Sequence, residues 1–499
     1  MKSKILLAII VLLGLGLRLF RLDSRPLGFT WDEAALGYNA YSLLKTGRDE
    51  HGQVLPIVLK SFGDYKPALY AYFSAPAIAL LGLTEGATRL PSAVFGTLLI
   101  GVVYLLVAKL LSARYAPAAA LLLAINPWSI YFSRGAWEAN LALFLTTLAT
   151  LLFVRRRYYT SALFFGFTLL AYQGAKMFTP LVLASLFISL RPPVKHLVKP
   201  VLLLLLIISP ILLGLSSQSG RLKIYSAFSY TRRPSDVQEI LSQDRIISPN
   251  LLFYLFHSEL LDQGRGVLQR YLNHLSPYYL FFAGDWQNYR HSLPYFGYFH
   301  VPELLTILIG LYFLIKSNRS GSKLILFWLV LAPLPAALSR DLVSGVRSLP
   351  LLLPLTIISG VGLTHLFRIR SARYLIVPVL IFSLAYFLDI LYVHSPNFTA
   401  ADMLTPYQPV FQLVKQNLSH YQKILITDKL GQPYIFALFY LHIDPRSYQT
   451  ANHFTPDPGG DVGHVDQFDK FEFRPIFWPK DGGLTSTLVI GDQYELYEP

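Results

Sequence analysis

Residues 90–111 read LPSAVFGTLLIGVVYLLVAKLL, an apolar run whose one charged side chain, Lys109, stands near its end. About 20 such residues in a helix cross the ~30 Å hydrocarbon core of a bilayer. The whole chain has this character, since 53% of its 499 residues are hydrophobic and only 14% are charged, against about 25% in a soluble domain. This composition excludes a soluble globule and a disordered chain. The sequence therefore predicts an α-helical polytopic membrane protein.

Ten further apolar runs predict membrane spans in addition to 90–111. They are residues 5–20, 115–132, 139–154, 158–174, 178–190, 197–215, 301–315, 324–339, 346–367 and 374–393. The first run follows a short basic start and precedes no small-x-small cleavage site, so we expect a retained signal anchor. Residues 67–83 are also apolar, but the distribution of charge favours a helix that lies on the membrane surface.

The net charge of +14 comes largely from short basic clusters between the apolar runs. The clusters are Lys109 and Arg114; Arg155, Arg156 and Arg157; Arg191, Lys195 and Lys199; Lys316, Arg319 and Lys323; and Arg368, Arg370 and Arg373. Eleven spans with a cytoplasmic N-terminus put all five clusters inside, as the positive-inside rule requires. The charge therefore indicates topology rather than nucleic-acid binding. No nucleotide-binding Gly-rich loop is present, which disfavours an ATP-driven machine, and the lack of cysteine excludes disulfides and thiolate catalysis.

This topology divides the chain into a transmembrane domain, residues 1–393, and a tail, residues 394–499. It places the tail and the loops 21–89 and 216–300 on the outer face of the plasma membrane. Strand-like runs at 423–427, 471–477 and 486–490 and an amphipathic stretch at 410–420 predict a small extracytoplasmic α/β domain in the tail. Its aspartates 457, 461, 466 and 469 fit no standard calcium loop, which favours a solvated loop.

The first outer loop contains FTWDEAALGYNAY at residues 29–41. Thr30 and Glu33 have the spacing of a capping box that opens a helix, so Glu33 has a structural alternative to a catalytic role. Asp32 is not needed for the box. It is well placed to take a proton from a substrate hydroxyl, although its position in the first helical turn also suits the helix dipole.

A second motif in this loop, GDYKPALY at residues 63–70, predicts an anion site. Pro67 favours the first position of a helix, which would put Lys66 at a helix N-terminus, where anions bind. The alternative is a lysine that reaches toward lipid headgroups. Arg347, within the predicted span 346–367, is costly at that depth and is therefore a functional candidate.

Other charged residues of the outer loops are weaker candidates. They are Asp64, Arg134, Glu138, His257 and His291. The two histidines, with Asp285 and other acids of loop 216–300, suggest a metal, but no His-x-x-x-His spacing is present. A divalent metal is therefore the less favoured alternative, and no cofactor is predicted.

Five motifs in order resemble one family of enzymes. They are Trp31-Asp32-Glu33-Ala34, Asp64-Tyr65-Lys66-Pro67, Arg89-Leu90-Pro91-Ser92, Phe132-Ser133-Arg134 and Arg347-Ser348-Leu349-Pro350. Together they are similar to the membrane glycosyltransferases of the protein O-mannosyltransferase and aminoarabinose-lipid-A transferase type, which have the C-type glycosyltransferase fold. The resemblance spans residues 1 to 393 and does not cover the tail.

The resemblance implies transfer of a sugar from a polyprenyl-phosphate donor to a hydroxyl of a protein, glycolipid or polysaccharide. It assigns the base to Asp32 and donor-phosphate binding to Lys66, with Arg134 and Arg347 as further candidates. The aminoarabinose enzymes carry an acid directly before this lysine, whereas here Tyr65 intervenes and Asp64 lies two positions before Lys66. The expected chemistry agrees with these assignments. The phosphate of the donor is a good leaving group, so the transfer needs only one base. A direct displacement predicts inversion.

Two other classes of function compete with a transferase. A transporter or flippase of lipid-linked sugars would carry charges at the bilayer midplane, whereas the acids here concentrate in outer loops. A polymerase of envelope polysaccharide belongs to the same alternative. A scaffold that presents the tail would leave Asp32, Lys66 and Arg347 without a purpose. The sequence therefore favours the transferase.

Overall fold

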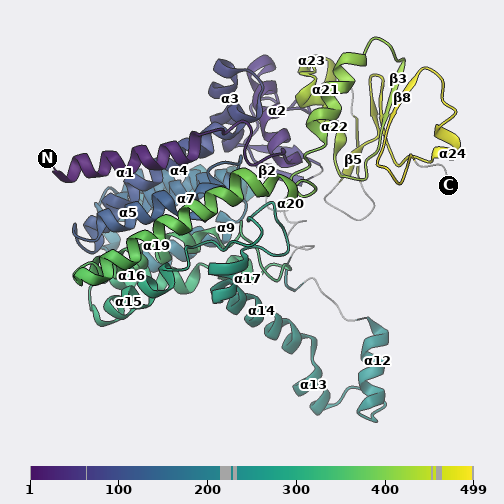
Figure 1. Ribbon diagram of the computed structural model, residues 1–499. Helices are drawn as coiled ribbons and strands as arrows, with labels where there is room; N and C mark the ends of the chain where they lie inside the picture. The colour runs from purple at the N-terminus through teal and green to yellow at the C-terminus, as the bar shows by residue number, and fades with distance from the viewer. Residues whose placement is uncertain are drawn as a thin grey trace.

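The computed structural model describes residues 2–62, 64–213, 226–228, 233–450, 453–456 and 463–496. It is a bundle of long helices with the N-terminus at one end and a small mixed domain, which contains the C-terminus, at the other (Figure 1). Each of the eleven predicted runs falls on a helix or on a pair of helices separated by a break.

The helices that match these runs are bounded as follows. They are α1 (Lys2–Leu19), α4 (Glu85–Leu110), α5 (Ala116–Ile125) with α6 (Pro127–Phe132), α7 (Glu138–Val154), α8 (Tyr158–Ala171), α9 (Ala175–Leu190), α10 (Val198–Leu213), α15 (Glu303–Lys316), α16 (Ser320–Leu331) with α17 (Leu334–Ala337), η3 (Leu349–Leu351) with α18 (Leu352–Leu366), and α19 (Arg370–Asp389) with the π-helical η4 (Ile390–His394). Four segments in the described part of the chain are long and apolar enough to cross a membrane: Glu85–Leu110, Ser320–Ala337, Leu349–Leu366 and Arg370–Phe398. The count of eleven spans stays a prediction.

Contacts between helix ends bring several basic clusters together. Arg319 donates to the carbonyl of Leu111 at 3.0 Å, and the Tyr115 hydroxyl lies 3.1 Å from His365 Nε2. The ends of α4, α15 and α18 therefore meet, and the clusters that follow them share one end of the bundle. This agrees with the prediction that these clusters lie on one side of the membrane.

The first outer loop forms a helix and a hairpin. Helix α2 (Trp31–Thr46) is followed by the antiparallel strands β1 (Val58–Ser61) and β2 (Asp64–Pro67) and by α3 (Leu69–Leu81). Strand β2 pairs with β1, with Lys66 opposite Leu59. The prediction that Pro67 opens a helix with Lys66 at its N-terminus is therefore wrong, because these residues are held in a hairpin and the helix begins after them.

The second outer loop extends away from the bundle (Figure 1). It contains α12 (Pro234–Gln243), α13 (Leu251–His257) and α14 (Glu259–Leu275), followed by the π-helical η2 (Tyr278–Ala283). His257, at the end of α13, lies 3.3 Å from a carboxylate oxygen of Asp244. Residues 284–300 then return to the bundle, where the His291 ring packs against Trp137.

The tail contains both helices and strands. After α20 (Ser395–Phe398), it contains α21 (Tyr407–Asn417), β3 (Lys423–Ile426), α22 (Pro433–Tyr440), α23 (Pro445–Tyr448), β4 (Phe454–Pro456), β5 (Gly463–Val465), β6 (Gln467–Phe468), β7 (Phe471–Phe473), α24 (Trp478–Asp481) and β8 (Thr487–Ile490). The main sheet has the order β6-β7-β3-β8, and β3 is parallel to both β7 and β8. The predicted strand 471–477 is shorter and ends at Phe473. Residues 457 and 461 lie outside the described residues, while Asp466 accepts a hydrogen bond from Thr455 at 2.7 Å.

Candidate active site

The N-terminus of α2 holds the two acids of the first motif in different environments. The Thr30 side chain accepts from the Glu33 amide at 3.4 Å, and Glu33 accepts from the Thr30 amide at 3.1 Å. The predicted capping box is confirmed. Asp32 takes no part in it, and its side chain is 40% exposed. Of the two neighbouring acids, only Asp32 is therefore accessible.

Glu33 belongs to a buried polar network. Its Oε1 accepts from Arg89 Nε and from the Ala136 amide, both at 2.9 Å. Arg89 is fully buried and also lies 3.6 Å from Glu85, which in turn accepts from the Tyr440 hydroxyl at 2.7 Å. The network ties α2 to α4, to the turn before α7 and to the tail domain. No role for Arg89 was predicted from the sequence, although this residue stands in one of the five motifs.

Asp32 forms an ion pair with Lys66 of β2. Lys66 is only 7% exposed, and its ammonium group lies 5.1 Å from the centre of the Phe62 ring. The hairpin thus directs the lysine inward, onto the first turn of α2. The structure brings together the proposed base and the proposed phosphate ligand from two separate motifs.

The loop that precedes α15 forms a second side of this region. The Arg290 guanidinium stacks over the Trp31 ring, 4.5 Å from its centre. Trp31 directly precedes Asp32 in the sequence. His291 Nδ1 lies 2.9 Å from Asp285 Oδ2, and its ring packs against Trp137 with centres 5.3 Å apart. Glu138 is the first residue of α7. It directly follows Trp137, the residue whose ring packs against His291.

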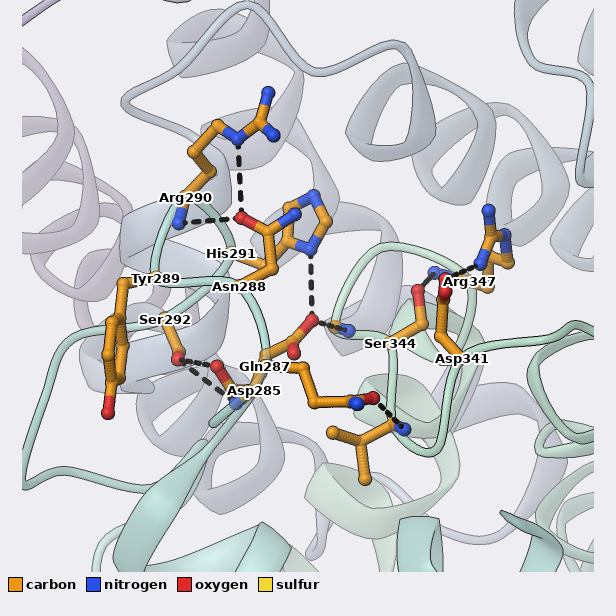
Figure 2. A network of polar contacts seen from close by, with 12 residues as sticks. Asp285, Gln287, Asn288, Tyr289, Arg290, His291, Ser292, Asp341, Ser344 and Arg347 are labelled. Carbon is orange, nitrogen blue, oxygen red and sulfur yellow. Dashed lines mark hydrogen bonds and ion pairs between the residues drawn. The ribbon is translucent and has the colours of Figure 1, made fainter. Parts of the chain in front are cut away.

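Arg347 lies in the loop before η3, not inside a helix, which corrects its predicted depth. It pairs with Asp341 (Figure 2) and donates to Ser339 at 3.2 Å. It also lines a small pocket together with Tyr172. The next residue, Gln173, donates to the carbonyl of Tyr65, the neighbour of Lys66, at 2.5 Å.

These contacts form a closed ring around the candidate site. From Asp32 and Lys66 it passes through Tyr65 and residues 172–173 to Arg347. It returns from the Gly345 amide, which donates to Asp285 at 2.8 Å, through His291 and Arg290 to Trp31. Five segments far apart in the sequence thus meet at the end of the bundle that faces the tail domain.

Two predicted candidates, Arg134 and His257, lie outside the ring, and the side chain of a third, Asp64, lies outside the described part of the chain. Arg134 donates to five backbone carbonyls of residues 17, 18, 20, 21 and 25 at 2.8–3.2 Å. His257 lies on the extended arm, away from α2 (Figure 1). The backbone of Asp64 lies in β2, but its side chain is outside the described part. Among the described residues, no three His, Asp or Glu side chains cluster so as to hold a metal ion.

The burial of the loop that links α2 to β1 changes the ionisation of a further acid. Glu50 is 1% exposed and bonds to the Asn39 side-chain amide at 3.2 Å. Burial raises the pKa of Glu50 to about 8. Burial thus favours the neutral form of this acid, unlike that of an exposed carboxylate.

Comparison with known proteins agrees with the motifs. Residues 65–213 match the family model described as dolichyl-phosphate-mannose-protein mannosyltransferase. No curated protein matches the sequence significantly. These matched residues include Lys66 and run from β2 to α10.

Solved structures share the fold at low sequence identity. ArnT from Cupriavidus metallidurans matches in its apo state with a TM-score of 0.55, 14% identity and coverage of 89% of this chain and 85% of that chain. Its structure bound to undecaprenyl phosphate matches with a TM-score of 0.54, 15% identity and coverage of 87% and 84%. The Archaeoglobus fulgidus oligosaccharyltransferase in complex with Zn and sulfate matches with a TM-score of 0.50, 15% identity and coverage of 87% and 61%.

The chain thus spans 61–64% of the length of the archaeal oligosaccharyltransferase. The resemblance indicated by the motifs is confirmed by the family model and the fold. The protein is a helical membrane protein with the fold of ArnT.

Proposed function

We propose that this chain transfers a sugar from a polyprenyl-phosphate donor to an acceptor hydroxyl on the outer face of the plasma membrane. The observation that carries the proposal is the ion pair between Asp32 and Lys66. It joins an accessible carboxylate to a buried ammonium group within the fold of ArnT, whose solved structures include one bound to undecaprenyl phosphate. The carboxylate suits an acceptor proton, and the ammonium group suits a phosphate.

The proposed step is a single displacement. The acceptor oxygen attacks the anomeric carbon while the bond from this carbon to the phosphate oxygen breaks. The acceptor proton passes to Asp32, and the polyprenyl phosphate leaves with the electron pair of the broken bond. Attack opposite the leaving group inverts the anomeric configuration. A hexosyl or a pentosyl donor is compatible with this chemistry.

The ion pair implies an order of binding. A carboxylate held by an ammonium group is a weaker base, because the neighbouring positive charge favours its ionised form. A donor phosphate would compete for Lys66 and release Asp32 from the pair. We therefore expect the donor to bind before the acceptor, so that the base is activated only when a sugar is present.

The proposed topology has eleven spans, with the domain 394–499 on the outer face. Contacts of this domain support a place for it beside the acceptor. The Gly463 amide donates to the carbonyl of Phe62 at 2.8 Å, and Gly431 lies against the Trp31 ring. The tail domain therefore touches the segments that carry both Asp32 and Lys66. We propose that it contributes to the choice between protein, glycolipid and polysaccharide acceptors.

The test is a cleavage assay with the purified full chain and a panel of polyprenyl-phosphate hexoses and pentoses. Release of polyprenyl monophosphate with one donor, and a product of inverted anomeric configuration by NMR, are expected. Retention of configuration would contradict the single displacement. Movement of intact donor across sealed proteoliposomes without cleavage would instead favour the flippase alternative.

A further inference from the structure

The His291 imidazole is held in one orientation by a buried acid. Asp285 is 1% exposed, and its Oδ2 also accepts from the Gly345 amide at 2.8 Å. The Asp285 amide is itself fixed, because it donates to Ser292 Oγ at 3.0 Å. Since Asp285 Oδ2 accepts from both sides, His291 donates from Nδ1, and in the imidazolium form, which the Asp285 carboxylate stabilises, Nε2 carries a second proton.

This arrangement leaves the other ring nitrogen, Nε2, for a ligand. Figure 2 shows the Asp285 carboxylate between the His291 ring and the loop with Ser344 and Arg347, and Nε2 on the side of the Arg290 guanidinium. Arg290 covers Trp31, next to Asp32. The side chain of His291 is 15% exposed, so the ring is not sealed off from solvent.

Charged groups of both signs surround His291, and two of them are arginines. Arg290 precedes it in the sequence, and Arg347 follows Gly345, whose amide shares Asp285. The neighbouring elements also carry His274, which accepts from the Ser344 amide at 2.9 Å, and Asp341, which is paired with Arg347. Glu138 follows Trp137, which packs on the ring. Asp341 and Asp285 are thus already engaged, while His291 Nε2 points to the side of Arg290.

We propose that His291, positioned by Asp285, donates a hydrogen bond from Nε2 to the phosphate that leaves the sugar. This inference rests on the proposed function. When the bond between the anomeric carbon and the phosphate oxygen breaks, both electrons go to that oxygen. A phosphodiester with about one negative charge becomes a monoester with about −1.5 to −2 charges at pH 7. The Nε2 proton is shared with this oxygen, Asp285 stabilises the imidazolium, and the acceptor proton goes separately to Asp32.

Such a contact is stronger with the product than with the donor. Catalysis requires a bond that strengthens as charge develops on the leaving group. A group that only supports the loop would affect both ligands equally. The difference between the affinities for polyprenyl monophosphate and for polyprenyl-phosphate sugar therefore separates the proposed role from a structural one.

The experiment measures both affinities for the purified full chain and two variants. In His291→Asn, the amide nitrogen takes the place of Nδ1, which preserves the contact with Asp285 and removes Nε2. In His291→Gln, the amide nitrogen reaches toward the place of Nε2. We expect His291→Asn to weaken monophosphate binding about tenfold, the size of one charge-assisted hydrogen bond. Donor binding should fall by less than about threefold, and His291→Gln should recover part of the loss.

His257→Asn is the matched control, because His257 also lies beside an aspartate, Asp244, but on the distant arm. It should leave both affinities unchanged. Equal losses for the two ligands in His291→Asn, or no loss, would overturn the inference while wild-type binding still supports the proposed function. If the wild-type chain binds neither lipid, the proposed function itself fails. Thermal melts of each variant exclude misfolding, and the Gln variant supplies an answer if the Asn variant does not fold.

Discussion

Two groups of cations in this molecule differ in the partners they have. In the first group, Arg18 is fully buried and donates to three backbone carbonyls and two serine hydroxyls. Arg134 likewise donates to five carbonyls. In the second group, Lys66 is paired with Asp32, which is 40% exposed, and Arg347 is paired with Asp341, which is 45% exposed.

The difference shows which buried charges are available for a ligand. A guanidinium that satisfies backbone carbonyls cannot leave them without exposing unpaired buried acceptors. An ammonium group paired with an exposed carboxylate loses little when a phosphate replaces that carboxylate, because water solvates the released acid. Burial of a charge is therefore a weaker sign of function than an exchangeable partner. By this criterion Lys66 and Arg347 belong to the proposed donor site and Arg134 does not.

The sharpest test of the comparison uses the neighbouring acids of α2. Asp32→Asn should lower turnover by about 10²–10⁴, because a positioned base is lost, while the melting temperature stays near that of the wild type. Glu33→Gln breaks a buried pair with Arg89, which should cost about 3–5 kcal/mol of stability. Turnover and thermal melts of both purified variants check this. Normal turnover in Asp32→Asn with a folded but inactive Glu33→Gln would reverse the two assignments.

A second test exchanges the cations for an apolar side chain of similar length. Lys66→Met should weaken donor binding about 10- to 100-fold through loss of a charge-assisted contact, with little change in stability. Arg134→Met leaves five buried carbonyls without their donor and should mainly lower the melting temperature. Binding of polyprenyl-phosphate sugar, measured below the melting temperature of each variant, distinguishes the two. Loss of affinity in a fully folded Arg134→Met would return Arg134 to the donor site.

A buried acid can be tested in the same way as the buried cations. Glu50 lies in the loop between α2 and β1, and burial raises its pKa to about 8. An acid with a raised pKa stabilises the fold below its ordinary pKa of about 4.3, and this contribution is lost as pH rises through the raised value. Stability should therefore fall between about pH 5 and pH 8, by at most ~1.4 kcal/mol per pH unit from this group. Melts across this range should show a shallower slope for Glu50→Gln. An unchanged slope would mean that Glu50 ionises freely in the fold.

The smallest perturbation tests the proposed topology, which places the second group of cations on the same side of the membrane as the tail domain. The chain has no cysteine, so single cysteines at Ser320 and Thr485 are unique labels. Ser320→Cys should be protected from an impermeant thiol reagent in intact cells, and Thr485→Cys should react. Neither exposed position should alter activity. Reaction of both cysteines would contradict the eleven-span topology and the outer position of the tail domain.

The sequence predicted the elements that depend on neighbouring residues. Apolar runs identified the bundle helices, because a helix buries or exposes its side chains according to their local composition. The capping box of α2 follows from Thr30 and Glu33, three positions apart. The α/β character of the tail came from short β-branched runs. Lys66 shows the limit of such reasoning. The pair Lys66-Pro67 suits the start of a helix, but its pairing with β1 places both residues in a strand.

Tertiary structure alone decided which charged residues could act together. Asp32 and Lys66 are 34 positions apart and Glu33 and Arg89 are 56 apart, so no local pattern could assign one acid to an exchangeable cation and the other to a fixed one. The same holds for Asp285, whose partner, the Gly345 amide, is 60 positions away in the sequence. Composition and periodicity specify where a segment lies relative to the membrane. The partner of a charge depends on which distant segments fold against it, because the cost of burying that charge is met only by groups that the whole fold brings within hydrogen-bonding distance.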